Sequence, residues 1–302
     1  MFTYILTVYT LALLVLSPVS ALPVPRREAI AKRDVPAGSS DFDVLVQGNQ
    51  QFRKNVDKGL MDELKAGQHP PFMMISCSDS RVGEGTIFNA KPGVFFTERN
   101  IANQVLPDDG NAQSALAYGV TELRVKHVIV MGHYGCGGVA AATLPAPRRP
   151  QQPAATAIQK WLTPIRELYS TSTRPEVAAM REANKDVSPG LNDPGFRALI
   201  EENVKANVQR IAEGPIIRNW FQLLSENPDK PATNGTVIER AADPSKPPAP
   251  VFIHGWIYDI ADGKITDLKA SVGPPGMKIP QVPFSDVATV AKRLVSGGHH
   301  NH

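Results

Sequence analysis

The chain alternates short apolar runs with longer stretches in which apolar residues recur at helical spacing. Over 41–66 the apolar positions return near every third or fourth residue, which predicts an early helical segment. The runs 72–75, 94–97 and 128–131 are short and almost wholly apolar, so each is predicted to be a buried strand. The segment 109–123, between the second and third runs, is predicted to be a helix.

The second half of the chain continues the same alternation. Helical spacing predicts helices over 157–169 and 196–212, and apolar runs predict a strand over 251–258 and another over 264–268. Strands that alternate with helices indicate βαβ units, and therefore an α/β fold with a central, mostly parallel sheet flanked by helices. The Pro-containing C-terminus is predicted to be a flexible tail with a short helix at 285–295.

The first residues have the pattern of a targeting segment. Residues 5–16 are uncharged and mostly apolar, and this length suits a signal-peptide core but not a bilayer span. Small residues at Val19 and Ala21 provide a cleavage site, although no Lys or Arg precedes the apolar run. We therefore expect a signal peptide over 1–21 and a secreted, extracellular protein; a buried N-terminal core segment is the alternative.

Two dibasic pairs follow, and the second, Lys32-Arg33, resembles a protease processing site. We expect a pro-segment over 22–33 and a single catalytic domain over 34–302. Removal of residues 1–33 takes away four basic residues and one acidic residue, which lowers the formal net charge from +3 to 0. The basicity thus belongs to the leader, and the mature chain has no charge excess that favours nucleic acid or a membrane as a partner.

A Pro-rich, polar stretch at about 225–250 is predicted to be a surface insertion in the domain. It contains the sequon that begins at Asn234, the only acceptor sequence for N-glycosylation in the chain. In a secreted protein, Asn234 is predicted to be glycosylated.

The chain has two cysteines, Cys77 and Cys136, and they allow two interpretations. One is a disulfide that closes a loop of about 60 residues and adds ~4 kcal/mol through loop entropy. The other is a metal site, because His133 lies three residues before Cys136 in a glycine-rich turn, and Cys77 ends a predicted strand. Two thiolates and one imidazole leave a fourth tetrahedral position open, as catalytic zinc sites do. The local sequences favour one zinc per chain.

These residues carry a resemblance to a known family. The motifs CSDSR at 77–81 and GHYGCGG at 132–138, with this spacing, resemble those of the β-class carbonic anhydrases. The likeness extends through NQQF at 49–52, RNIAN at 99–103 and GWIYD at 255–259, and it covers roughly residues 40–270. It implies the family's α/β fold with an N-terminal helical arm, and zinc held by the two cysteines and the histidine.

The resemblance also implies a reaction, the reversible hydration of carbon dioxide to bicarbonate and a proton by attack of zinc-bound hydroxide. In the family the carboxylate at the position of Asp79 accepts a hydrogen bond from that hydroxide, and the guanidinium at the position of Arg81 holds the carboxylate in place and ionised. We expect Asp79 to lie within hydrogen-bond reach of the zinc-bound water without coordinating the metal. Alternatively, Asp79 caps the following segment and Arg81 is its salt-bridge partner.

Further residues match the plant-like subgroup of the family. Counted from the motifs, Gln68, Phe96 and Tyr118 stand where that subgroup has the Gln, Phe and Tyr of its substrate pocket, and Ile101 and Gly137 join the predicted pocket. Because the family places the Gln and the aromatic residues at a subunit interface, the resemblance implies a homodimer or a larger homo-oligomer. Alternatively, Phe96 and Tyr118 are core residues and Gln68 belongs to a loop.

Two competing functions stay open from the sequence. The same scaffold can hydrolyse related cumulenes such as CS2 or COS, and a non-catalytic secreted protein with a Cys77–Cys136 disulfide would need no metal. Three other residues attract attention. His127 and His254 flank or lie in strands and are predicted to be structural, while Tyr134 stands between two expected ligands, where it narrows or polarises the site.

Overall fold

The computed structural model describes residues 40–147, 152–183, 186–226 and 248–286. Several predicted features lie outside these described residues: the signal peptide, the pro-segment, Asn234, and most of the Pro-rich insertion. Most of the C-terminal tail, with its predicted helix, lies outside them as well. The chain divides into two units, residues 1–61 and 62–302, which are described separately.

The first unit contains helix α1 (Asp41–Asn55), which begins where the Ser40 amide donates a hydrogen bond to the Asp43 carboxylate at 2.7 Å. The chain leaves helical geometry at Val56, and α2 (Lys58–Ala66) follows. The helical prediction for 41–66 is confirmed, apart from this break. No residue of α1 is buried, and its apolar side chains are 41–75% exposed; they are Phe42, Val44, Leu45, Val46 and Phe52.

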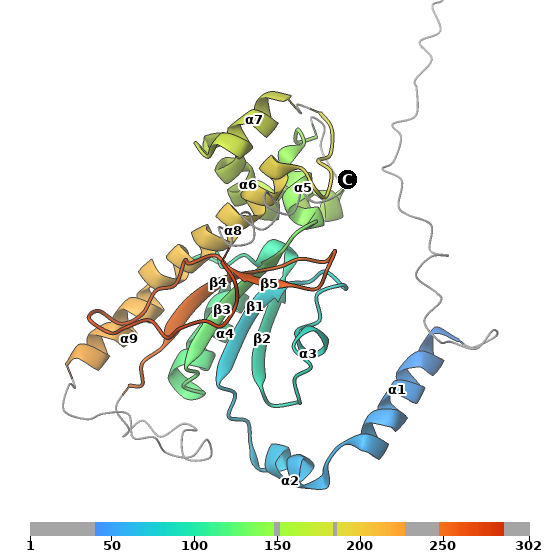
Figure 1. The fold of residues 1–302 in the computed structure, drawn as a ribbon, viewed down its shortest axis with the longest axis vertical. Coiled ribbons are helices and arrows are strands. Elements are labelled where there is room, and N and C mark those ends of the chain that lie inside the picture. Colours follow the sequence, from blue (N-terminus) through green and yellow to red (C-terminus); the bar gives the residue numbers. More distant parts are fainter. Residues whose placement is uncertain (1–39, 148–151, 184–185, 227–247, 287–302) are drawn as a thin grey trace, which may run out of the picture. The chain divides into compact units, whose positions relative to one another are not determined.

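The second unit is built on a five-stranded sheet in the order β2-β1-β3-β4-β5. Four strands are parallel, and β5 is antiparallel to β4. The strands are β1 (Phe72–Cys77), β2 (Phe95–Asn100), β3 (His127–His133), β4 (Phe252–Tyr258) and β5 (Ile265–Asp267). All five overlap strands predicted from the sequence, and the predicted α/β class with a mostly parallel sheet is confirmed (Figure 1).

Only some helices of this unit were predicted from the sequence. The predicted helices 157–169 and 196–212 are confirmed, while 109–123 forms α4 and then a π-helical turn over Tyr118–Glu122. Four further helices, α3, α5, α7 and α9, stand in segments without a prediction. The helices are α3 (Glu84–Ile87), α4 (Gly110–Ala117), α5 (Gly137–Thr143), α6 (Pro153–Thr171), α7 (Pro175–Ala183), α8 (Pro194–Glu213) and α9 (Pro215–Ser225).

The larger core forms where α8 packs against β3 and β4 (Figure 1). Glycines on β3 and β4 allow α8 to pack close to these two strands. A Cβ at Gly132 would lie 2.5 Å from Val204 of α8, and a Cβ at Gly255 would lie 3.2 Å from the same side chain. A second buried cluster, centred on Met74, Ile129 and Trp256, covers the other face of the sheet. Among the described residues, no helix has the length and apolarity needed to cross a membrane.

Candidate metal centre

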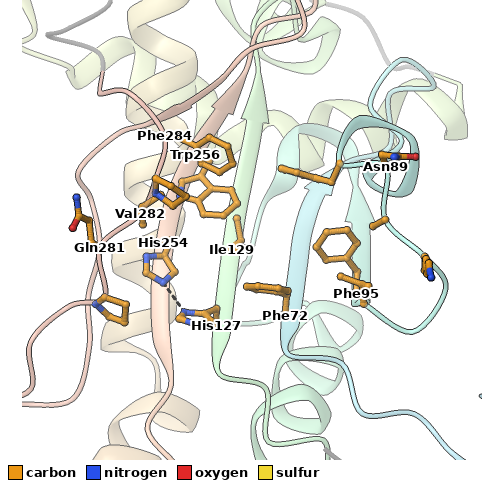
Figure 2. A pocket seen from close by; sticks show the side chains of 16 residues that line it. Phe72, Asn89, Phe95, His127, Ile129, His254, Trp256, Gln281, Val282 and Phe284 are labelled. Carbon is orange, nitrogen blue, oxygen red and sulfur yellow. Dashed lines mark hydrogen bonds between the residues drawn. The ribbon is translucent and has the colours of Figure 1, made fainter. Parts of the chain in front are cut away.

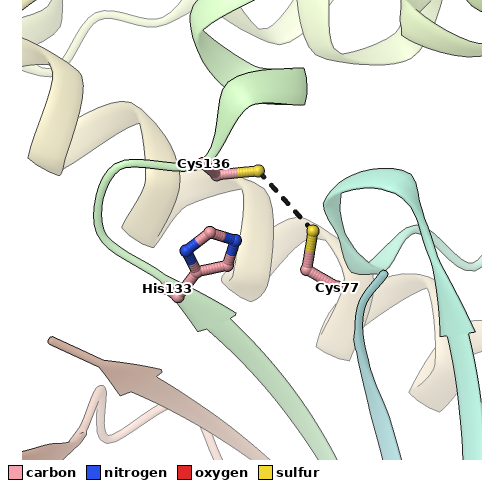
Figure 3. Close-up of side chains that lie close together, drawn as sticks. All are labelled: Cys77, His133 and Cys136. Atoms are coloured by element: carbon pink, nitrogen blue, oxygen red, sulfur yellow. Dashed lines mark hydrogen bonds between the residues drawn. The ribbon is translucent and has the colours of Figure 1, made fainter. Parts of the chain in front are cut away.

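The three expected metal ligands come together at the carboxyl edge of the sheet. Cys77 is the last residue of β1, and His133 is the last residue of β3. These strands are parallel neighbours, so their ends meet at the same edge, and Cys136 follows on the loop that enters α5. Figure 3 shows the three side chains converging from the two strand ends and the loop. Open α/β sheets place their sites at this edge.

The geometry of the trio fits a tetrahedral metal ion. Their ligand atoms lie within 4.8 Å of one another, and all three residues are buried. The Nε2 atom of His133 is buried and has no hydrogen-bond partner among the described residues, while Nδ1 lies 3.1 Å from the backbone oxygen of Tyr134. A buried nitrogen without a partner costs free energy unless something else binds it. Two sulfurs and one nitrogen are the donors that zinc prefers.

The two cysteines are free thiols whose sulfurs are 3.9 Å apart. Their hydrogen bond lowers the pKa of Cys77 and raises that of Cys136, and burial raises the Cys136 pKa further. A bound dication would favour the loss of protons from both thiols. The separation is about twice the length of a disulfide bond, so the geometry does not support the disulfide interpretation.

Asp79 and Arg81 form a bidentate ion pair beside the trio. The Arg81 guanidinium donates to the two carboxylate oxygens of Asp79 at 2.6 and 2.9 Å, and it also donates to the backbone oxygen of Gly135 at 3.1 Å. Mainly because of the hydrogen bonds from Arg81, the pKa of Asp79 is lowered to about 2. One Asp79 oxygen lies 3.7 Å from Nε2 of His133. An ionised acceptor thus stands at the edge of the metal centre.

The other predicted pocket residues are brought together only in part. The rings of Phe96 and Tyr118 lie 5.8 Å apart, and Tyr118 is 47% exposed. Ile101 packs against the first turn of α5, where a Cβ on Gly138 would lie 2.7 Å from it, and the space around Gly137 is open. Gln68 is exposed and has no hydrogen bond to any described residue.

Ala102 and Arg99 of the RNIAN motif hold the expected ligand Cys77 through contacts that the motif alone did not specify. The Ala102 amide donates to the Cys77 sulfur at 3.4 Å, and the Ala102 backbone has a positive φ of 62°. Asn203 of α8 donates to the Ala102 carbonyl at 3.0 Å, which holds this unusual conformation. Arg99 donates to the carbonyls of Cys77, Asp79 and Val82, and so it holds the loop after β1.

A cavity of about 620 Å³ lies elsewhere, toward the amino ends of the strands. Its wall is mainly apolar and contains none of the predicted site residues; its aromatic residues include Phe72, Phe88, Phe95, Trp256 and Phe284. Figure 2 shows His127 and His254 facing each other on its floor, with 3.0 Å between Nδ1 of His127 and Nε2 of His254. His254 also contacts the Ser271 hydroxyl at 2.9 Å. Burial lowers the pKa of His254 to about 4, so the pair is neutral at pH 7.

Comparisons with known proteins identify the family of this chain. A family model described as carbonic anhydrase matches residues 72–223. A carbonic anhydrase of Emericella nidulans is 31% identical over 231 residues, which are 75% of this chain and 82% of that protein.

Solved structures extend the comparison. A tetrameric β-carbonic anhydrase of Sordaria macrospora is 26% identical, with a TM-score of 0.55 over 76% of this chain and 95% of its own. A β-carbonic anhydrase of Aspergillus fumigatus is 26% identical, with a TM-score of 0.56 over 85% of this chain and 98% of its own. A Coccomyxa β-carbonic anhydrase in complex with acetazolamide is 21% identical and shares the fold, with a TM-score of 0.60 over 87% of this chain and 100% of its own. By its sequence and its fold together, the chain belongs to the β-class carbonic anhydrase family.

Proposed function

We propose that this protein catalyses the reversible hydration of carbon dioxide to bicarbonate and a proton, with one zinc ion held by Cys77, His133 and Cys136. The observation that carries the proposal is the convergence of three buried ligand atoms, one of them a histidine nitrogen without a partner. Family membership supports the reaction. The open position of a three-ligand set supports a catalytic rather than a structural metal.

When bound, zinc would lower the pKa of a water molecule from 15.7 to about 7 and so supply hydroxide at neutral pH. The chain's own residues provide the orientation. Asp79 is ionised and can only accept hydrogen bonds, so it would fix the direction of an O–H group at the metal centre. Arg81 keeps that carboxylate in place and ties it to the loop of the other two ligands through Gly135.

The substrate is small and apolar, and the proposed pocket suits it. Phe96, Tyr118 and Ile101 would form the apolar wall, with open space beside Gly137. Gln68 would donate a hydrogen bond to a substrate oxygen, as in the plant-like subgroup. Because Gln68 and Tyr118 are exposed in a single chain, we assign the completion of this pocket to a second copy.

The proposed assembly is therefore a homodimer or a larger homo-oligomer. The exposed apolar side chains of α1 support it, since an apolar helix face without a partner is unfavourable in water. The Sordaria relative is tetrameric.

We also infer that the protein is secreted, with cleavage after Ala21, removal of residues 22–33 and a glycan on Asn234. The apolar core of the leader, the dibasic pair and the sequon support this route. Mass spectrometry of the protein from its culture medium tests it. An intact N-terminus inside cells, with unmodified Asn234, would contradict secretion.

Elemental analysis and a stopped-flow assay test the catalytic proposal. We expect one zinc per chain, rapid hydration of carbon dioxide, and loss of both in Cys77→Ala. Cys77→Ala also tests the disulfide alternative, which predicts no stoichiometric zinc in either protein. Hydrolysis of CS2 or COS without hydration of carbon dioxide would replace the proposed reaction but keep the metal.

A further inference from the structure

Tyr134 stands between the two proposed ligands His133 and Cys136, yet its side chain is held by a different part of the fold. The residue is 5% exposed. Its hydroxyl donates a hydrogen bond of 2.8 Å to the carboxylate of Glu201 on α8. Glu201 is itself buried, and its other oxygen accepts a hydrogen bond of 2.7 Å from Arg174. A buried carboxylate is stable only when it is paired in this way.

The ring and the backbone of Tyr134 have further contacts. The guanidinium of Arg197, also on α8, lies 3.4 Å from the centre of the ring, and it pairs with Asp259 at 3.0 Å. The Tyr134 amide donates to the carbonyl of Tyr258, the last residue of β4, at 3.0 Å. Hydroxyl, ring and amide are thus fixed by three different groups, which leaves the peptide that follows little freedom to rotate.

That peptide carries the carbonyl that orients His133. A carbonyl oxygen can only accept, so its 3.1 Å contact with Nδ1 places the imidazole proton on Nδ1. The lone pair is then on Nε2, the buried atom without a hydrogen-bond partner among the described residues, so Nε2 is the nitrogen available to a metal. The partner of the non-ligating nitrogen sets both the tautomer and the ring direction of a metal-binding histidine.

We propose that Tyr134 is a positioning residue for the metal ligand His133, and that its hydrogen bond to Glu201 is the anchor that holds the orienting carbonyl. The inference rests on the proposed zinc function. Helix α8 then supports the loop of His133 and Cys136 through Glu201. It also supports the segment beside Cys77, because Asn203 of the same helix holds Ala102 there.

Three variants test the proposal. Tyr134→Phe removes only the hydroxyl, and Glu201→Gln keeps an oxygen that accepts from it, while Arg174 retains Glu176 and Glu202 as partners. Tyr169→Phe is the matched control, because the Tyr169 hydroxyl has no hydrogen bond to any described residue. The readouts are the zinc dissociation constant, from competition with a chelator, and the visible absorption spectrum of the cobalt-substituted protein.

We expect Tyr134→Phe to weaken zinc binding by about 10-fold or more and to shift the cobalt bands, because the imidazole is held less firmly. We expect Glu201→Gln to retain a zinc affinity close to that of the wild type, and Tyr169→Phe to change neither readout. A merely structural tyrosine would lower the melting temperature without moving the cobalt spectrum.

The opposite results overturn the inference. Wild-type zinc affinity and an unshifted cobalt spectrum in Tyr134→Phe would do so, whatever its melting temperature. If that variant does not fold, Glu201→Ala removes the acceptor and leaves the tyrosine in place, and unchanged zinc affinity there has the same meaning. A wild-type protein without stoichiometric zinc would instead refute the proposed function, so the two failures are distinguishable.

Discussion

At the scale of single residues, the metal centre combines side chains whose roles differ sharply although they are close in sequence. Cys77 and Asp79 are two positions apart, yet the first is buried in the cluster and the second faces it from an ion pair with Arg81. Residue type and spacing singled out these residues in the sequence, and the structure brings them close together. The sequence did not reveal Asn203 or Glu201, since their partners are distant in sequence and no motif marks them.

The role proposed for Asp79 predicts the behaviour of Asp79→Asn. The amide has nearly the same shape, but it lacks the charge and donates hydrogen bonds from one end, so it would orient an O–H group poorly. We expect kcat for hydration of carbon dioxide to fall by roughly 10²-fold or more, with zinc content unchanged. Stopped-flow kinetics and elemental analysis measure the two quantities. Asp262→Asn, which alters an exposed carboxylate paired with Lys264, is the control.

Because the pKa of Asp79 is lowered to about 2, its ionisation does not contribute to the activity profile between pH 5 and 9. A kcat for Asp79→Asn within twofold of the wild type would remove Asp79 from the mechanism.

The buried His254 predicts how the stability of the fold depends on pH. The folded-state pKa of His254 is about 4, below its usual value of 6.5, so the unfolded chain binds a proton more readily than the folded protein. The stability from the neutral imidazole is therefore present above pH 6.5 and is lost as the pH falls toward 4. This contribution to the free energy of unfolding is on the order of 3 kcal/mol.

Urea unfolding of the wild type and of His254→Phe, at several pH values from 4 to 7, isolates this effect. The difference in unfolding free energy between the two proteins should decrease as the pH falls below 6.5, because the variant cannot take up that proton. A difference that stays constant over this range would show that His254 is not held neutral.

At the scale of elements, the strands were easier to predict than the helices. Apolar runs mark the strands, and all five overlap their predicted positions. The strand β2 was predicted to be buried, but it lies at the sheet edge and only its Glu98 is buried. The helices α3 and α5 are short, and α5 opens with two glycines, so local propensity does not indicate them. Pro215 stands in the first turn of α9, a position that favours proline, and α6, α7 and α8 also begin with a proline.

The packing of α8 on β3 predicts a cost for Gly132→Ala. The added Cβ would lie 2.5 Å from Val204 and 3.2 Å from Ile257, too close for either neighbour to stay in place. We expect the free energy of unfolding, measured in urea, to fall by about 1–3 kcal/mol. Gly85→Ala is the matched control, because its Cβ meets nothing within 4 Å and alanine favours helix. Equal stability of the two variants would contradict a close contact at Gly132.

At the scale of the whole molecule, the exposed apolar side chains of α1 bear on the proposed assembly. A helix in which no residue is buried gains little from its Phe and Leu side chains unless another surface covers them. The same apolar spacing led the sequence to predict a helix, and that prediction is confirmed. The burial that normally accompanies such spacing is absent from α1.

This face predicts the effect of Leu45→Asp, a change at a side chain that is 68% exposed in the single chain. If a second copy covers it, a buried charge would be introduced, so we expect the oligomer to dissociate into monomers. Size-exclusion chromatography with light scattering measures the molar mass. Gln51→Asp, on the same helix at a polar position, should leave the assembly intact. A monomeric wild type, or an unchanged Leu45→Asp oligomer, would contradict the proposed role of α1.

By itself the sequence determined the α/β class and the positions of the strands, and it singled out the residues that we propose bind the metal. These depend on residue type, short spacing and apolar runs, which are local properties of a chain. Only the tertiary structure decided which distant groups support the ligands, from Asn203 behind Ala102 to Glu201 behind Tyr134. It also left the apolar face of α1 exposed. Both outcomes arise from packing between elements far apart in sequence, where each contact depends on the arrangement of the others.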